Sequence, residues 1–157
     1  MEKNITPIVR DQLFSLDLFF KNQFKGKSRY GTMGSFFWKI FTNPFGKGFV
    51  NAIHHEGNIV ATTSITPKSL FIKQVEYTAA EIGDTYTDRK FQGRGLFSLL
   101  VNESRKVAND AEIKFIYGTP NNQSLPGYIK NTGFNIVDEF KYKSILIVPR
   151  RILHFSG

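Results

Sequence analysis

The chain changes character within the stretch DTYTDRKFQGRGLFSLL, which occupies residues 84–100. The β-branched and aromatic residues at its start are typical of a strand, and the residues after Gly95 have the apolar spacing of a helix. Glycines at positions 93 and 95 permit backbone angles that other residues rarely adopt, and they let a ligand approach the backbone closely. The stretch therefore predicts a strand, a glycine-rich turn and a helix, in that order.

The predicted turn has the features of an anion-binding site. The first N–H groups of an α-helix lack partners within the helix and lie at the positive end of its dipole, and Arg94 adds a positive side chain. The Walker pattern is excluded because its Gly-Lys-Ser/Thr is missing, and the dinucleotide fingerprint lacks its third glycine and its early βαβ position. Glycine-rich turns also precede helices for steric reasons alone. The turn by itself therefore leaves both pyrophosphate binding and a steric role open.

The remaining sequence predicts an α+β fold. Before the turn, apolar periodicity predicts helices at residues 9–24 and 35–41, and strands at 49–54, 59–65, 70–72 and 75–87. We expect Pro67 to interrupt the second of these strands, and the last is long enough to contain a bulge. After the turn we expect a helix at 96–110, a short buried strand at 115–117, a helix at 125–131 stopped by Gly133, and strands at 135–137 and 142–148. Together these elements predict a mixed, mostly antiparallel sheet flanked by helices.

Composition limits the class of protein. The 157 residues, of which 41% are hydrophobic, suit one domain with a packed core, so we expect a single domain over residues 1–157. The absence of cysteine excludes disulfides, thiolate-bound zinc and a cysteine nucleophile, and the three histidines show no metal-site spacing. No apolar run approaches the roughly 18 residues of a membrane helix and no signal peptide opens the chain, so we expect a cytoplasmic protein without a membrane span.

The net charge of +8 suits a polyanionic partner. The basic residues are dispersed, however, and they do not alternate with aromatic residues in the manner of a nucleic-acid platform. We therefore expect no nucleic-acid partner. A basic nucleic-acid-binding protein is the least favoured of the functions that we consider for this chain. The tail at residues 149–157 would pack, pair with a second copy in a homodimer, or continue into a longer protein.

Two motifs in this chain resemble those of the GNAT superfamily of acyl-CoA-dependent N-acyltransferases. Residues 92–97 resemble its pyrophosphate loop, Gln/Arg-x-x-Gly-x-Gly/Ala, with Gln92 and Gly95 in the first two fixed positions and Phe97 in the third. The second motif follows in the right order, with Asn121, then Ser124 where alanine is usual, then Tyr128 and Gly133-Phe134. The resemblance covers residues 49–148. Phe97 also resembles a subgroup with Arg-Gly-Lys-Gly-Ile-Phe at this point.

The resemblance implies a sheet that splays between its fourth and fifth strands, with acetyl-CoA, as the acyl-CoA co-substrate, held in the opening without a metal. It implies that Tyr128 protonates the leaving thiolate as general acid. The cofactor-binding residues that it implies are Tyr86, Thr87, Gln92, Gly93, Arg94, Gly95, Leu96, Phe97, Asn121 and Ser124.

The general base is left open between Glu81 and Asp84, which lie on the strand that leads into the turn. Side chains alternate along a regular strand, so these two carboxylates point to opposite faces unless a bulge intervenes. Either could instead be paired with a lysine or arginine, and His54 is next in line. Trp38, together with the phenylalanines at 36, 37 and 41, would either wall an acceptor pocket or pack in the core.

We expect an enzyme that transfers an acyl group, most simply acetyl, to a primary amine by direct attack on the thioester. The subgroup resemblance favours a small-molecule acceptor, an amino sugar or another metabolite, over a protein lysine. The second alternative is a GNAT-fold module that binds acyl-CoA or another nucleotide without turnover.

Overall fold

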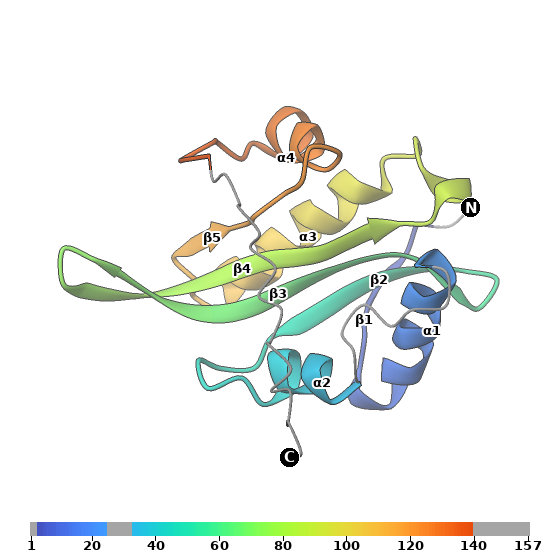
Figure 1. Ribbon diagram of the computed structural model, residues 1–157, viewed down its shortest axis with the longest axis horizontal. Helices are drawn as coiled ribbons and strands as arrows, with labels where there is room; N and C mark the ends of the chain where they lie inside the picture. The colour runs from blue at the N-terminus through green and yellow to red at the C-terminus, as the bar shows by residue number, and fades with distance from the viewer. Residues whose placement is uncertain (1–2, 25–32, 140–157) are drawn as a thin grey trace, which may run out of the picture.

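The structure is a computed structural model, and it describes residues 3–24 and 33–139. Its fold is α+β, as predicted, with one five-stranded mixed sheet (Figure 1). The strands are β1 (Ile5–Pro7), β2 (Phe49–His55), β3 (Asn58–Ile72), β4 (Val75–Thr87) and β5 (Phe115–Tyr117), and they lie in that order across the sheet. Every neighbouring pair is antiparallel except β4 and β5, which run parallel.

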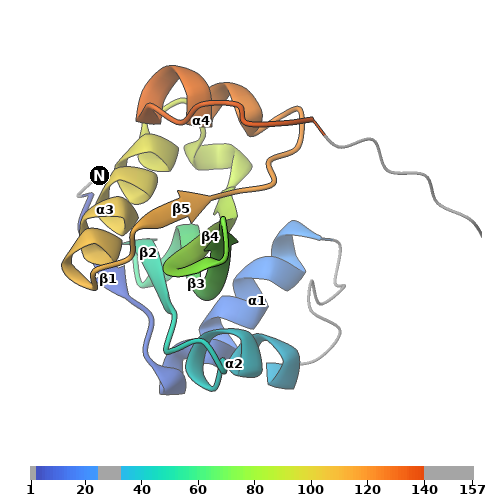
Figure 2. The same cartoon turned by 90° about the vertical axis from the view of Figure 1, so that its left-hand side faces the viewer.

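Helices cover both faces of the sheet (Figure 2). Helices α1 (Leu13–Gln23) and α2 (Met33–Phe41) lie on one face, and α3 (Leu96–Asp110) and α4 (Leu125–Thr132) lie on the other. Short 3-10 turns precede α1 and follow β4, at η1 (Arg10–Gln12) and η2 (Arg89–Phe91). The helix predicted at residues 9–24 therefore begins later, at Leu13, after the 3-10 turn.

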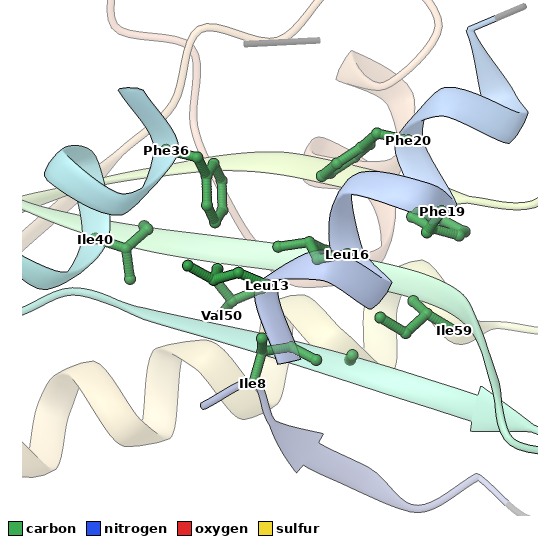
Figure 3. Close-up of a cluster of buried hydrophobic side chains, with 10 residues drawn as sticks. Ile8, Leu13, Leu16, Phe19, Phe20, Phe36, Ile40, Val50 and Ile59 are labelled. Atoms are coloured by element: carbon green, nitrogen blue, oxygen red, sulfur yellow. The ribbon is translucent and has the colours of Figure 1, made fainter. Parts of the chain in front are cut away.

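Each face of the sheet has its own apolar core. Figure 3 shows the core beneath α1 and α2, where Leu16, Phe20 and Ile40 meet Val50 of β2. On the other face, Leu96 and Leu100 of α3 pack on Ile53 of β2. Because both faces are covered, β3 is buried without interruption from Ile59 to Pro67. None of the helices in the described ranges is both long and apolar enough to cross a bilayer.

Pro67 does not interrupt β3, which was a wrong prediction. Strand β2 begins at Phe49, opposite Ile65, so β3 beyond that point has only β4 as a hydrogen-bonded partner. The Cδ of Pro67 lies 3.2 Å from the position that a Cβ on Gly48 would take, so the buried ring lies on the β2 side of β3, against the segment that precedes β2. A proline there forfeits no ladder hydrogen bond. The two strands predicted at 59–65 and 70–72 are therefore one.

The end of the described chain also differs from the prediction. Residues 135–137 are not a strand within residues 133–139, and the strand predicted at 142–148 and the tail lie outside the described residues. Strand β5 is present where predicted, but it is not buried, since Phe115 and Tyr117 are about 40% exposed among the described residues.

Strand β4 contains a bulge close to its end. The pairs Thr62–Tyr86 and Ser64–Gly83 leave both Asp84 and Thr85 opposite Thr63 alone. The extra residue is Asp84, whose φ of +50° is unusual for a residue other than glycine. The alternation of side chains between the two faces of the sheet is therefore shifted by one residue from Asp84 onward.

Strands β4 and β5 part soon after they meet. Their pairing covers Ala79 to Glu81 on β4 and Phe115 to Tyr117 on β5, while β4 itself continues to Thr87. Among the described residues, the last part of β4 therefore has no strand on its β5 side, which is the splay expected between the fourth and fifth strands.

Candidate active site

The glycine-rich turn, residues 92–97, has the geometry expected of it. Gly93 and Gly95 have φ angles of +74° and +76°, and Gly95 is the N-cap of α3. A Cβ at either position would meet nothing within 4 Å, so the backbone angles, and not crowding, require glycine. Because the N-cap is a glycine, no N-cap side chain accepts a hydrogen bond from the first amides of α3.

Side chains next to the turn hold it in place. The Nε2 of Gln92 donates to the Thr87 carbonyl oxygen at 3.0 Å, which joins the turn to the end of β4. The guanidinium of Arg94 lies over the Phe91 ring, 5.1 Å from its centroid, and donates to the Lys90 carbonyl. The side chains of Gln92 and Arg94 thus shape the turn itself, and the backbone amides are the groups it presents outward.

Leu96 and Phe97, also predicted to bind the cofactor, have different surroundings. The side chain of Leu96 is buried in the core, so only its amide can face a ligand. The ring of Phe97 is half-buried and meets the Tyr128 ring edge-on, with 4.9 Å between the centroids. A Cβ on Gly127 would lie only 2.8 Å from the Phe97 ring, so α4 packs tightly on the start of α3. This packing accounts for a phenylalanine at the third position of the loop motif.

The two residues at the end of β4 point in opposite directions. The Tyr86 ring packs against Phe19 of α1 and against Phe24, which directly follows that helix, with centroids 6.0 and 5.4 Å away. The hydroxyl of Thr87 is buried and has no hydrogen-bond partner among the described residues. A buried hydroxyl without a partner costs free energy, so Thr87 is a place where a ligand would be stabilised.

Tyr128 is joined to β4 by hydroxyl groups. Its Oη lies 2.8 Å from the Oγ1 of Thr85, which lies 2.8 Å from the Oγ1 of Thr63. Burial raises the pKa of the Tyr128 phenol above its ordinary value; the hydrogen bond with Thr85 opposes this rise and the charge of Asp84 adds to it. The phenol is therefore protonated at neutral pH and has a proton to donate.

Asn121 and Ser124 shape the turn that begins α4. The Oδ1 of Asn121 accepts hydrogen bonds from the amides of Gln123 and Ser124, both at 3.0 Å. The Oγ of Ser124 donates to the Asn121 carbonyl oxygen. Both side chains thus fix the start of the helix that holds Tyr128, the capping role that asparagine and serine commonly have.

The bulge brings both candidate bases to the same face of the sheet. Asp84 is buried, and its Oδ2 accepts from Lys39 Nζ of α2 at 2.8 Å and from Ser64 Oγ at 2.6 Å. Glu81 is paired across the strands with Thr66, and among the described residues it forms an ion pair with Lys68, 3.8 Å away. Without the bulge, the two carboxylates would lie on opposite faces of the sheet. The bulge that we allowed for between them is present, and it puts them on one face.

A pocket of about 780 Å³ opens beside α2 on this face. We call it the α2 pocket, and its lining residues are Gly34, Ser35, Trp38, Lys39, Asn43, Thr66, Lys68 and Glu81. Glu81 lines it directly, whereas Asp84 reaches it only through Lys39. Trp38 is 57% exposed and belongs to the pocket, while Phe36 belongs to the core. Of the aromatic residues of α2, Trp38 therefore lines this pocket and Phe36 packs in the core.

Sequence reasoning missed Lys39, Ser64 and Thr85, the partners of Asp84 and Tyr128. Lys39 is 45 residues from Asp84 and Thr85 is 43 from Tyr128, so no local pattern joins them. His54 contacts Thr6 across the sheet and does not line the pocket. Within the described residues, no group of three or more His, Asp or Glu side chains could hold a metal ion.

Comparisons with known proteins point to one family. A family model described as the acetyltransferase (GNAT) domain matches residues 19–137. A comparison with curated proteins returned no match.

Solved structures share the fold. An acetyltransferase from Trypanosoma brucei is 16% identical with a TM-score of 0.71, and the match covers 92% of this chain and 100% of that one. Glucosamine-6-phosphate N-acetyltransferase from Arabidopsis thaliana is 17% identical with a TM-score of 0.70, covering 91% and 99%. A predicted acetyltransferase from Clostridium acetobutylicum, solved with acetyl-CoA, is 17% identical with a TM-score of 0.72, covering 91% and 96%.

Proposed function

The chain belongs to the GNAT acetyltransferase domain family, and from this premise we propose that it transfers an acetyl group from acetyl-CoA to a primary amine of a small molecule, such as an amino sugar. One observation carries the proposal: an open glycine-rich turn follows the end of β4, and the Tyr128 hydroxyl is hydrogen-bonded to Thr85 of the same strand. An anion site and a proton donor thus flank the part of β4 that β5 leaves unpaired.

The residues present fit acetyl-CoA. The amides of residues 92–97 would hold its pyrophosphate, because they lie at the start of α3 and Arg94 adds positive charge beside them. The backbone of Tyr86 and Thr87 would pair with the pantetheine arm, as a strand pairs with a sheet edge. The unpartnered hydroxyl of Thr87 would gain a hydrogen bond on binding.

The chemistry needs three groups. A base removes a proton from the ammonium of the acceptor, and the free amine nitrogen then attacks the thioester carbon. Backbone N–H groups along the free edge of β4 would stabilise the negative oxygen of the tetrahedral intermediate. As the carbon–sulfur bond breaks, the Tyr128 phenol would give its proton to the thiolate, which leaves as CoA. The nitrogen loses a second proton as the neutral amide forms, and the Tyr128 phenolate takes up a proton in turn, so the phenol is restored.

We assign the base to Glu81. Its carboxylate lines the α2 pocket, its side chain is 29% exposed, and its contact with Lys68 at 3.8 Å is longer than a hydrogen bond. Asp84 is a weaker candidate, because Lys39 and Ser64 both donate to its Oδ2 and would have to release it. We assign Asp84 the separate role of fixing α2 to the β4 bulge.

The test combines binding with turnover. Acetyl-CoA should raise the melting temperature, since a ligand of the native state stabilises it by RT ln(1 + [L]/Kd). Thiol release from acetyl-CoA should then depend on an added amine. A clear thermal shift without thiol release from any amine in a broad panel would contradict transfer, and it would favour a module that binds acyl-CoA without turnover.

A further inference from the structure

We propose that Thr85 is a positioning residue of the reaction: its hydroxyl donates a hydrogen bond to Tyr128 and thereby turns the phenolic proton toward the leaving sulfur. This inference rests on the proposed function and extends it to Thr85 of β4 and Thr63 of β3. The hydroxyl oxygens of the three residues form a row, with 2.8 Å from Tyr128 to Thr85 and 2.8 Å from Thr85 to Thr63. We call these three groups the hydroxyl row.

The distances around the hydroxyl row favour one direction of donation. A hydroxyl group has one proton to donate, so the row can run from Tyr128 to Thr63 or from Thr63 to Tyr128. In the first direction, the Thr63 proton has the Gly83 carbonyl oxygen, 3.5 Å away, as its one acceptor among the described residues. An O–H···O bond is usually about 2.5–3.0 Å long, so this contact is weak. In the second direction both bonds of the row span 2.8 Å and no weak contact is needed, so this direction is the more stable one.

The second direction leaves the phenolic proton of Tyr128 for the ligand. Thr85 is the one hydrogen-bond partner of this hydroxyl within the described part of the chain, and in this direction it is the donor. The Phe97 and Phe134 rings pack edge-on against the Tyr128 ring, with centroids 4.9 and 5.3 Å away, so the ring is held in place. The direction of the O–H bond is then set by Thr85, and the proton can reach the sulfur.

The same donation stabilises the phenolate that remains after the proton has left. A hydrogen bond to an ionised group is roughly twice as strong as one between neutral groups, so the bond from Thr85 strengthens as Tyr128 ionises. Burial and the charge of Asp84 both raise the pKa of the phenol, and the hydrogen bond with Thr85 lowers it. The nearby cation on α3, Arg105, donates to the Thr132 carbonyl oxygen. Thr85 is therefore the neighbour that favours the phenolate.

The first experiment measures the ionisation of Tyr128 without any substrate. Replacing the six tyrosines by a ring-fluorinated tyrosine lowers the pKa of each phenol and gives each ring a fluorine NMR signal. The signal of residue 128 is the one that Tyr128→Phe lacks. Thr85→Val, which keeps the side-chain shape and removes the hydroxyl, should raise the pKa of this phenol, and Thr85→Ser should restore it. An unchanged pKa in Thr85→Val would overturn the inference.

The second experiment is a double-mutant cycle on turnover. Thr85→Val should lower kcat at least about tenfold in the parent, because it removes a hydrogen bond to a group that becomes charged. It should have no further effect in Tyr128→Phe, because the Thr85 hydroxyl acts through the phenol. Thr63→Val should lower kcat by a smaller factor, and also only when the Tyr128 hydroxyl is present. If Thr85→Val lowers kcat equally in both backgrounds, its role is structural and the inference fails.

Thr62→Val is the matched control for this cycle. Thr62 also lies on β3, and its Oγ1 donates to the Asp84 carbonyl oxygen at 3.0 Å, so it too joins β3 to the β4 bulge. It has no hydrogen bond to the hydroxyl row within the described residues. Any effect of Thr62→Val on kcat should therefore be the same with and without the Tyr128 hydroxyl. A coupling to Tyr128 as large as that of Thr85 would contradict the inference.

The two experiments separate the inference from the proposed function. If Thr85→Val shifts the ionisation of Tyr128 but the parent acetylates no amine, the function fails and the direction of the hydrogen bonds stands. If the parent acetylates an amine and Thr85→Val does so at the same kcat, the function stands and the inference fails.

Discussion

The glycine-rich turn and the α2 pocket both adjoin strand β4, but they are assembled in different ways. The turn consists of consecutive residues, and its shape depends on two positive φ angles and on contacts between residues close in sequence. The pocket gathers residues from α2, β3 and β4, and it is joined to the β4 bulge by the Lys39–Asp84 ion pair. The turn is thus a local structure and the pocket a tertiary one.

Because of this difference, we expect the two regions to recognise their ligands through different groups, the turn through its backbone and the pocket through its side chains. In the function that we propose, pyrophosphate would be recognised through backbone amides, which every residue except proline provides, so the turn would need a backbone shape more than particular side chains. An acceptor is recognised through side chains, which can be changed one at a time. We therefore expect substitutions in the turn to remove binding of acetyl-CoA altogether, and substitutions in the pocket to change which amine is acetylated.

The largest effect should come from placing a negative charge in the turn. Gly95→Glu puts a carboxylate where the pyrophosphate would bind, so it should abolish the thermal shift with acetyl-CoA. At 100 times Kd that shift corresponds to about 2.7 kcal/mol. Gly57→Glu is the control, because Gly57 has the same φ of +76° and nothing within 4 Å, but lies in the β2–β3 turn. A folded Gly95→Glu protein with a normal shift would disprove this location.

The second effect concerns the proton that Tyr128 would give to the leaving thiolate. Tyr128→Phe keeps the ring between Phe97 and Phe134 and removes only the hydroxyl. We expect kcat to fall by roughly 10²–10⁴ while the thermal shift with acetyl-CoA stays intact. Tyr77→Phe, on the outer part of β4, should leave kcat unchanged. Unaltered turnover in Tyr128→Phe would assign that residue a purely structural role.

The third effect should distinguish the two carboxylates. Glu81→Gln should lower kcat/KM at least about tenfold, with little change in melting temperature. Asp84→Asn should mainly lower the melting temperature, because it leaves the Lys39 ammonium without its carboxylate. If Asp84→Asn alone lowers kcat/KM to that extent, Asp84 is the base. If neither variant lowers kcat/KM, neither carboxylate is the base.

The smallest effect is on stability at high pH. The folded protein raises the pKa of Tyr128 above the unfolded value of 10.0, chiefly through burial. As pH rises above 10 the unfolded chain loses this proton first, so the free energy of unfolding falls until the buried phenol also ionises. Tyr128→Phe has no phenol at this position, so it should lose less stability between pH 9 and 11 than the parent does. Chemical denaturation at several pH values would measure the free energy of unfolding of both proteins. If it falls equally with pH in the parent and in Tyr128→Phe, the prediction is wrong.

The errors in prediction have a common origin. Pro67 was expected to break β3, and this would hold for a strand paired on both sides, but the relative lengths of β2 and β3 leave Pro67 beside an open edge. Residues 135–137 were expected to form a strand because their composition suits one. Strand pairing needs a partner at the right position, and a single segment does not reveal where its partner lies.

The strand, the glycine-rich turn and the helix that follows were all predictable from the residues alone, as was the end of α4 at Gly133. These features depend on preferences of single residues and on contacts within a few positions along the chain, so their pattern can be recognised in the sequence. Packing between distant elements, by contrast, places Asp84 with Glu81 on the α2 face, pairs it with Lys39, and leaves the Thr66 hydroxyl without a hydrogen-bond partner among the described residues. A bulge shifts every side chain after it to the other face, and its position is fixed by packing between elements rather than by the residues of one strand.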